Sequence, residues 1–374
     1  MLKIVFGILL LVASAHALDI PANDSRIYHT EYNWYQDKQL GFLETANPGA
    51  YIKVDFTGSS IGIKLDASLL NFPYCTLAWS IDHGPEQDIQ LPAANNFVQL
   101  AGNLDKSKNH SLYLFVKNAL QGQDRWFGPD VRIRIMSVTI DDGATIMTPT
   151  LAPKRLLAYW DSIGEGVAIN GANGDLASND AHVTWAYSLA LAINVELSIV
   201  AWGAQGYTVG GMGNTPPLWN ADGGANSSAW KWMSSKYPRS FDVCPDYIIC
   251  GHGTNDGFRG KPDQVYTNAL GWLQEIKQTC ATSKLFLTVP FGRFMEDPIV
   301  RAYQTYQSTK SDPSVVLIQL GDRGSKGLSA WGATFEAVDG IHPWAWKSSQ
   351  LGALLAAEIA PHLESSRVSI YDLQ

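Results

Sequence analysis

The chain has 374 residues, a formal net charge of −8 at pH 7 and a sequence pI near 5.5. Nucleic-acid-binding proteins need a concentrated basic surface, and no run of Lys or Arg occurs here, so we exclude nucleic acids and acidic polymers as partners. At roughly 150 residues per domain, the chain is long enough for two domains with separate cores.

The first 17 residues have the pattern of a secretory signal peptide. A charged start at Lys3 is followed by an apolar run and by the small-residue end Ala15-His16-Ala17. An N-terminal membrane anchor is the alternative, but the run is too short to span a bilayer comfortably, and no other stretch approaches about 20 apolar residues. We therefore predict cleavage after Ala17 and a secreted, extracellular protein that is not bound to a membrane.

Secretion makes disulfides and glycosylation possible. Cys244 and Cys280 each precede an apolar run, so they would lie at the same end of a parallel sheet, where a disulfide between them is reasonable. Cys75 and Cys250 look buried and unpaired, and the cysteine spacing fits no zinc site, so we predict no metal. Three glycosylation sequons begin at Asn23, Asn109 and Asn226.

Residues 18–150 show the period-two pattern of antiparallel strands. Apolar Ile52, Val54 and Phe56 alternate with polar residues, and similar runs are separated by turn clusters such as Asn47-Pro48-Gly49. No long helical pattern interrupts them. We therefore predict a β-sandwich domain of jelly-roll type over 18–150.

A proline-containing segment, Met147–Lys154, marks the boundary, and from residue 151 to 374 strand and helix patterns alternate. This alternation predicts a three-layer α/β/α domain around a parallel sheet, with functional loops at the carboxyl ends of its strands. The predicted strands are Leu156–Trp160, Val195–Ala201, Tyr247–Gly251, Leu285–Val289 and Val315–Leu320, and the predicted helices are Thr184–Asn194, Asp263–Thr279 and Ser348–Ile359.

Ser162 follows the first of these strands in Asp161-Ser162-Ile163-Gly164-Glu165-Gly166 and is the candidate nucleophile. A serine hydroxyl needs a base within hydrogen-bond reach. His342 is the candidate base, because Asp339 precedes it and Pro343 follows it; His182 is the second choice. Asp339 could orient the imidazole and stabilise its protonated form.

Acyl transfer also needs donors to the oxyanion that develops on the substrate carbonyl. Three candidates lie at strand ends: the backbone N–H of Ser162, the backbone N–H of Gly206 and the side-chain amide of Asn255. The glycine-rich stretch 203–213 lacks the Lys-Ser/Thr ending of a phosphate loop. We therefore predict no nucleotide or other cofactor.

These segments together resemble a known superfamily. Asp161-Ser162-Ile163, Gly206, Gly253-x-Asn255-Asp256 and Asp339-x-x-His342-Pro343 are similar to the four blocks of the SGNH (GDSL) hydrolases, and they cover the chain from about residue 156 to its end. The resemblance implies nucleophile, oxyanion and base roles for Ser162, Gly206, Asn255 and His342. With the preceding sandwich, the whole chain resembles the two-domain carbohydrate esterases of family 2, which implies removal of acetyl groups from polysaccharides such as xylan or glucomannan.

Two departures from the family pattern concern the site. Trp160 stands where the family usually has glycine, and we expect its ring to shape the acyl or sugar pocket. Family 2 esterases often use a backbone carbonyl in place of the acidic residue, whereas Asp339 is present here, so a triad and a Ser–His dyad both remain open. Trp344 and Trp346 are candidate stacking platforms for sugar rings.

Three functions follow from these residues. The first is a secreted serine esterase whose partner is an acetylated polysaccharide or oligosaccharide. The second uses the same machinery on lipid, feruloyl or other small esters. The third is a glycan-binding protein with a decayed hydrolase site. The glycan, the acyl position and the oligomeric state do not follow from the sequence.

Overall fold

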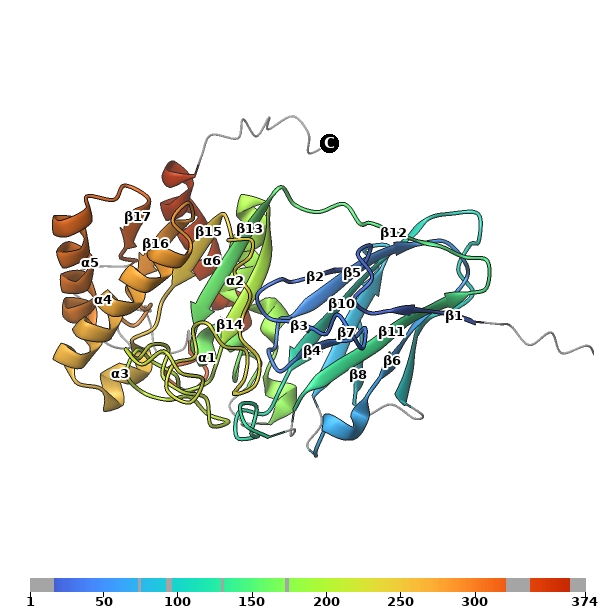
Figure 1. Ribbon diagram of the computed structural model, residues 1–374, viewed down its shortest axis with the longest axis horizontal. Helices are drawn as coiled ribbons and strands as arrows, with labels where there is room; N and C mark the ends of the chain where they lie inside the picture. The colour runs from blue at the N-terminus through green and yellow to red at the C-terminus, as the bar shows by residue number, and fades with distance from the viewer. Residues whose placement is uncertain are drawn as a thin grey trace, which may run out of the picture.

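The computed structural model describes residues 17–72, 75–91, 96–128, 131–171, 175–320 and 337–363. Two bodies lie side by side in it: a sandwich of antiparallel sheets and a parallel sheet covered by helices on both faces (Figure 1). This is the predicted fold class.

Alternating apolar residues build the sandwich, because those on the inner faces of two sheets share one core. The first sheet has the order β3-β4-β11-β6-β9 with β1 added on β11, and the second has the order β12-β5-β10-β7-β8 with β2 added on β5. The first contains β1 (Ala17–Pro21), β3 (Tyr35–Gln36), β4 (Leu43–Thr45), β6 (Ile61–Leu65), β9 (Phe97–Ala101) and β11 (Ile133–Asp141). The second contains β2 (Tyr28–His29), β5 (Tyr51–Phe56), β7 (Thr76–Ile81), β8 (Gln87–Gln90), β10 (His110–Asn118) and β12 (Ile146–Met147).

The parallel sheet has the order β14-β13-β15-β16-β17. It contains β13 (Lys154–Trp160), β14 (Val195–Ala201), β15 (Tyr247–Cys250), β16 (Lys284–Thr288) and β17 (Val315–Ile318). The helices are α1 (Ser162–Glu165), α2 (Trp185–Ile193), α3 (Thr254–Arg259), α4 (Pro262–Thr279), α5 (Glu296–Lys310) and α6 (Ala345–Ile359), with short 3-10 turns at Ala67–Leu69, Leu176–Ser178, Ala181–Val183 and Ala360–His362. In the described residues, no helix is both long and apolar enough to cross a membrane.

The two faces of this sheet carry separate cores because side chains alternate along β13. Leu157 and Tyr159 pack on one face with α4 and α5, whereas Ala158 and Trp160 pack on the other with α2 and α6. All four side chains are buried. The sheet is therefore covered on both faces, as predicted.

The α5 helix was absent from the predicted elements. Only one of its faces is apolar: Ile299, Ala302 and Tyr306 are buried, while most other positions hold charged residues or Gln, Ser and Thr. Packing of this narrow apolar stripe against the sheet stabilises a helix that the local sequence composition does not predict.

The predicted disulfide is confirmed: Cys244 and Cys280 are bonded, with their Cα atoms 5.5 Å apart. It joins the segment before β15 to the end of α4. Cys75 and Cys250 are buried and free, also as predicted.

Candidate active site

The turn that carries Ser162 lies at the carboxyl end of β13. Asp161 caps α1 by accepting a hydrogen bond from the N–H of Ile163 at 3.0 Å, and Gly166 ends the helix in the left-handed region with φ of 78°. A Cβ at position 166 would come within 2.1 Å of the Asp180 carbonyl oxygen, so glycine is required there. Ser162 is thereby held on a short, doubly anchored turn.

The structure brings together the three residues predicted for nucleophilic catalysis. The Oγ of Ser162 lies 2.8 Å from Nε2 of His342, and Nδ1 of His342 lies 2.7 Å from Oδ2 of Asp339. The backbone N–H groups of Ile341 and His342 donate to Oδ1 of Asp339. With the Nδ1 proton bonded to Asp339, Nε2 is free to accept the Ser162 proton. The arrangement is that of a Ser-His-Asp triad.

Asp339 is ionised at neutral pH. Burial opposes its charge, but the pKa of this carboxyl is held well below its usual range by the hydrogen bond and electrostatic interaction with the His342 ring and by the backbone N–H groups of His342 and Ile341. Asp339 therefore keeps a negative charge with which to stabilise an imidazolium at His342.

We expect Asp339→Asn to lower kcat on p-nitrophenyl acetate by about 10²–10⁴, because an amide stabilises neither the required tautomer nor the imidazolium. The matched control is Asp142→Asn, an exposed residue of the sandwich, which should keep the wild-type rate. A wild-type rate for Asp339→Asn would instead identify a Ser–His dyad.

Two of the three predicted oxyanion donors lie at this edge with hydrogens suited to the role. The N–H of Ser162, at the first position of α1, has no acceptor within the helix. Nδ2 of Asn255 lies 3.0 Å from the Gln205 carbonyl oxygen and 3.4 Å from Oδ2 of Asp161. The second contact is long for a hydrogen bond, so one amide hydrogen is only weakly engaged. Burial raises the pKa of Asp161 to about 6.

Gly206 differs from the expectation. Its N–H donates to the Val209 carbonyl oxygen at 2.9 Å, so this donor is already occupied, and its oxyanion role stays a prediction that requires the bond to open. Gly206 leaves room for the Asp256 carboxylate, which a Cβ would approach to 2.2 Å. That carboxylate accepts the N–H groups of Tyr207 and Thr208 and fixes the loop after β14.

An ion pair that the sequence did not reveal lies beneath this edge. Nη1 of Arg125, from the sandwich, lies 2.5 Å from Oε1 of Glu165 in α1, and both side chains are almost fully buried. The other oxygen of Glu165 accepts the N–H of Gly203, and the Arg125 guanidinium lies over the ring of Trp202. No spacing motif links residues 125 and 165, so only the tertiary fold shows that the sandwich supports the nucleophile turn.

The expectation that Trp160 lines the substrate pocket is wrong. Its side chain is fully buried, with its ring centroid 4.3 Å from that of Trp185 and 5.1 Å from that of Phe291. Alternation along β13 places Trp160 on the helix-covered face, whereas the active site lies beyond the strand end. Gly251 makes room for this ring.

The remaining candidate residues are the two tryptophans predicted to bind sugar and the second-choice base. Trp344 is half-buried at the start of α6, and Trp346 is 47% exposed, so both remain available as sugar platforms close in sequence to His342. His182, the second-choice base, instead stacks on Phe115 at 4.1 Å and faces Glu86. In the part of the chain that the structure describes, no group of three His, Cys, Asp or Glu residues could hold a metal ion.

No protein-family model matches the chain, and no curated protein matches its sequence. Solved structures do match its fold. A family two carbohydrate esterase from Cellvibrio japonicus aligns with a TM-score of 0.71 and 15% identity, over 93% of this chain and 98% of that one. An acetyl xylan esterase from Butyrivibrio proteoclasticus gives 0.71 and 16%, over 93% and 99%. A family two esterase from Clostridium thermocellum in complex with cellohexaose gives 0.67 and 16%, over 90% and 98%.

These matches span both bodies of the molecule, and a GDSL-like lipase from Bacteroides ovatus shares the fold as well. The architecture is therefore that of an SGNH-type α/β hydrolase domain preceded by a β-sandwich. More narrowly, it is the two-domain fold of the family 2 carbohydrate esterases, in agreement with the resemblance that the sequence motifs indicated.

Proposed function

We propose that this protein is a carboxylic ester hydrolase that removes acetyl groups from O-acetylated polysaccharide through an acyl-enzyme. The observation that carries the proposal is the continuous hydrogen-bonded chain from Ser162 through His342 to Asp339. A decayed site would have no reason to keep three such groups in contact across a long stretch of sequence. This disfavours the non-enzymatic alternative.

The mechanism uses the residues in the order of their contacts. Nε2 of His342 takes the proton of Ser162 as Oγ attacks the ester carbonyl, and Asp339 stabilises the imidazolium. The N–H of Ser162 and the amide of Asn255 donate to the tetrahedral oxyanion. Collapse expels the sugar hydroxyl, which receives its proton from His342. Water activated by His342 then attacks the acyl-enzyme, and acetate and free Ser162 result.

Two observations support a glycan as the leaving group. Structural neighbours include an acetyl xylan esterase and an esterase with bound cellohexaose. In addition, Trp346, four residues after the base in the sequence and in the first turn of α6, exposes nearly half of its surface, as a stacking surface would. Lipid, feruloyl and other small esters are the alternative substrates for the same machinery.

Chain-length profiling separates these substrates. We expect the rate on p-nitrophenyl esters to be highest for acetyl and to fall steeply from butyrate to octanoate, and we expect acetate release from acetylated xylan or glucomannan. Assays should use the full chain without residues 1–17. A maximum at medium chains, or at feruloyl esters, together with no acetate release from glycans, would contradict the polysaccharide assignment.

We also propose that the protein is secreted and glycosylated. Asn109 and Asn226 are exposed, as glycan acceptors must be. The amide of Asn23, in contrast, donates to the Asp37 carbonyl oxygen at 3.0 Å, which disfavours modification at that sequon. Of the predicted signal peptide, residues 1–17, all but Ala17 lie outside the described residues.

A further inference from the structure

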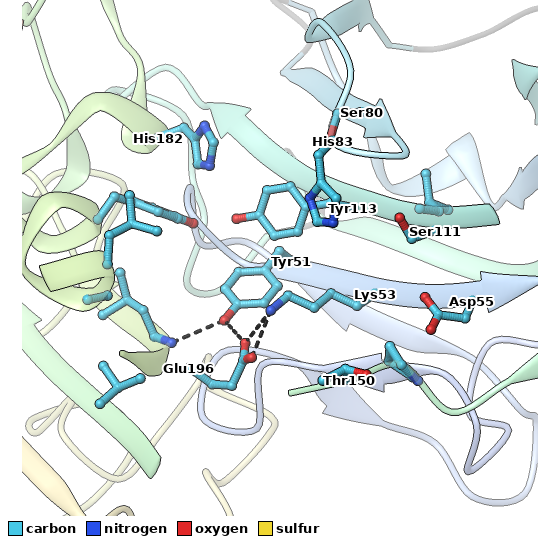
Figure 2. A pocket seen from close by; sticks show the side chains of 17 residues that line it. Tyr51, Lys53, Asp55, Ser80, His83, Ser111, Tyr113, Thr150, His182 and Glu196 are labelled. Atoms are coloured by element: carbon cyan, nitrogen blue, oxygen red, sulfur yellow. Dashed lines mark hydrogen bonds and ion pairs between the residues drawn. The ribbon is translucent and has the colours of Figure 1, made fainter. Parts of the chain in front are cut away.

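A cavity of about 510 Å³ lies between the sandwich and the hydrolase domain (Figure 2), and none of its lining residues belongs to the triad. One wall includes Glu196 and Leu197 at the start of β14, whereas the catalytic loops follow the opposite ends of the strands. Strands of this length separate the two places by roughly 20 Å. The size is within the range of small-ligand sites, roughly 300–1,000 Å³, which occur preferentially at domain interfaces.

Strand register explains which side chains face this cavity. Lys53 on β5, Tyr113 on β10 and Ser80 on β7 form one row across the outer face of the second sheet. Asp55 and Ser111 form the next row. All five lie along the cavity, so it has a tyrosine ring flanked by hydroxyl, carboxylate and ammonium groups (Figure 2).

The charges around the cavity nearly cancel. Nζ of Lys53 lies 2.7 Å from Oε1 of Glu196, whose other oxygen accepts the hydroxyl proton of Tyr51 at 2.5 Å. Glu196 also accepts the N–H of Ala152 and so has its full set of partners. Among the described residues, Asp55 makes no salt bridge, and its carboxylate interacts electrostatically with the imidazole of His83, which also lines the cavity. The other lining groups that can carry positive charge each have an acidic neighbour: His83 interacts electrostatically with Asp55, and His182 lies 3.6 Å from Glu86. The cavity therefore offers no excess positive charge to an anion.

Polar groups without partners point to a ligand rich in hydroxyls. Within the described part of the chain, the side chains of Asp55, Ser80, Ser111 and Thr150 make no hydrogen bond to another protein group, and all four are at least partly exposed and so open to a ligand. The opposite wall, at the end of α2, is apolar and includes Ala190 and a largely exposed Leu191. An aromatic and aliphatic surface beside free acceptors and donors fits a sugar ring, whose C–H faces are apolar and whose edges carry hydroxyls.

We propose that this interdomain cavity, lined by Tyr113, Asp55 and Ser111, is a second, non-catalytic binding site for a neutral oligosaccharide. An anionic sugar would meet the unpaired Asp55 carboxylate and is disfavoured. A fatty acyl chain would leave the polar row of Asp55 and Ser111 desolvated without partners, at a cost for each group. The site does not depend on the proposed catalysis, since none of its residues belongs to the triad.

The test measures binding of cellohexaose, xylohexaose and mannohexaose to the full chain carrying Ser162→Ala, by calorimetry. Asp55→Ala removes the free carboxylate, and Ser111→Trp fills the cavity. Their matched controls are Asp142→Ala, at an exposed turn of the sandwich, and Ser308→Trp, on the exposed face of α5. Hydrogen exchange of β5 and β10 amides locates the bound sugar.

At least one of the three oligosaccharides should bind with protection of β5 and β10, and each cavity variant should weaken this binding tenfold or more. The control variants should leave binding unchanged. When Ser162 is kept, all four variants should hydrolyse p-nitrophenyl acetate at the wild-type rate. Three results would overturn the proposal. The first is binding that neither cavity variant changes, and the second is that no probe binds at β5 and β10. The third is preferential binding of hexagalacturonate or octanoate there. If Ser111→Trp does not fold, the effect of Asp55→Ala on oligosaccharide binding tests the proposal by itself. Esterase activity is measured separately from oligosaccharide binding. The proposed catalytic function and the proposed second binding site can therefore fail independently.

Discussion

Replacing Ser162 by alanine should lower turnover of p-nitrophenyl acetate by about 10⁴–10⁶, because the residual rate of a triad enzyme without its nucleophile comes from its oxyanion hole and binding alone. The hydroxyl oxygen is the atom that His342 contacts at 2.8 Å, and it is the only heavy atom that the substitution removes. Burst kinetics with the wild-type protein should also show an acyl-enzyme, and the burst should vanish in the variant.

The fold should survive this substitution, since the cap of α1 is made by Asp161 and not by Ser162. Circular dichroism and the thermal midpoint provide that check. Ser308→Ala on exposed α5 is the matched control and should keep full activity. Retention of substantial turnover by Ser162→Ala would contradict both the nucleophile assignment and the acyl-enzyme mechanism.

Arg125→Met should cost about 3–5 kcal/mol of the free energy of unfolding, since breaking a buried ion pair leaves an uncompensated charge. The charge left behind is Glu165, at 2% side-chain exposure, in the helix that carries Ser162. We also expect kcat to fall by up to about 100-fold, because small displacements of a reacting group are costly. Urea unfolding and p-nitrophenyl acetate kinetics measure the two effects.

The double variant Arg125→Met/Glu165→Gln separates charge from packing. A glutamine side chain at position 165 would keep an acceptor for the Gly203 N–H while removing the unpaired charge, so the double variant should be more stable than Arg125→Met alone. An exposed pair provides the comparison: Lys108→Met, beside Asp105, should change stability by less than about 1 kcal/mol. If Arg125→Met were equally mild, the buried pair would not support the nucleophile turn.

Helices and strands that have a clear hydrophobic pattern within their own segment could be predicted from the sequence. Val195–Ala201 was predicted with the bounds that the structure has. The predicted range of α2 is one residue too long at each end, and that of α4 begins one residue late. Parallel strands place their carboxyl ends together, so Ser162 and Asn255 could be assigned to one edge without coordinates. The disulfide followed from the same reasoning.

What depends on tertiary contacts could not be predicted in this way. The Arg125–Glu165 pair joins two domains, and nothing in either segment distinguishes these residues from solvated charges. The bond from Gly206 to Val209 depends on the path of a loop. Trp160 was assigned to the pocket from its place near Ser162, but side chains that are close along a strand can face opposite sides of the sheet.

Trp160 and Gly251 share a single volume. A Cβ at position 251 would fall 1.9 Å from the Trp160 ring, so the indole occupies the space that a side chain on the neighbouring strand would need. Glycine in place of Trp160 would leave that space free. Residue sizes at the two positions should therefore vary inversely among relatives, and a chain that acquired the tryptophan could do so only after, or together with, the loss of a side chain at position 251.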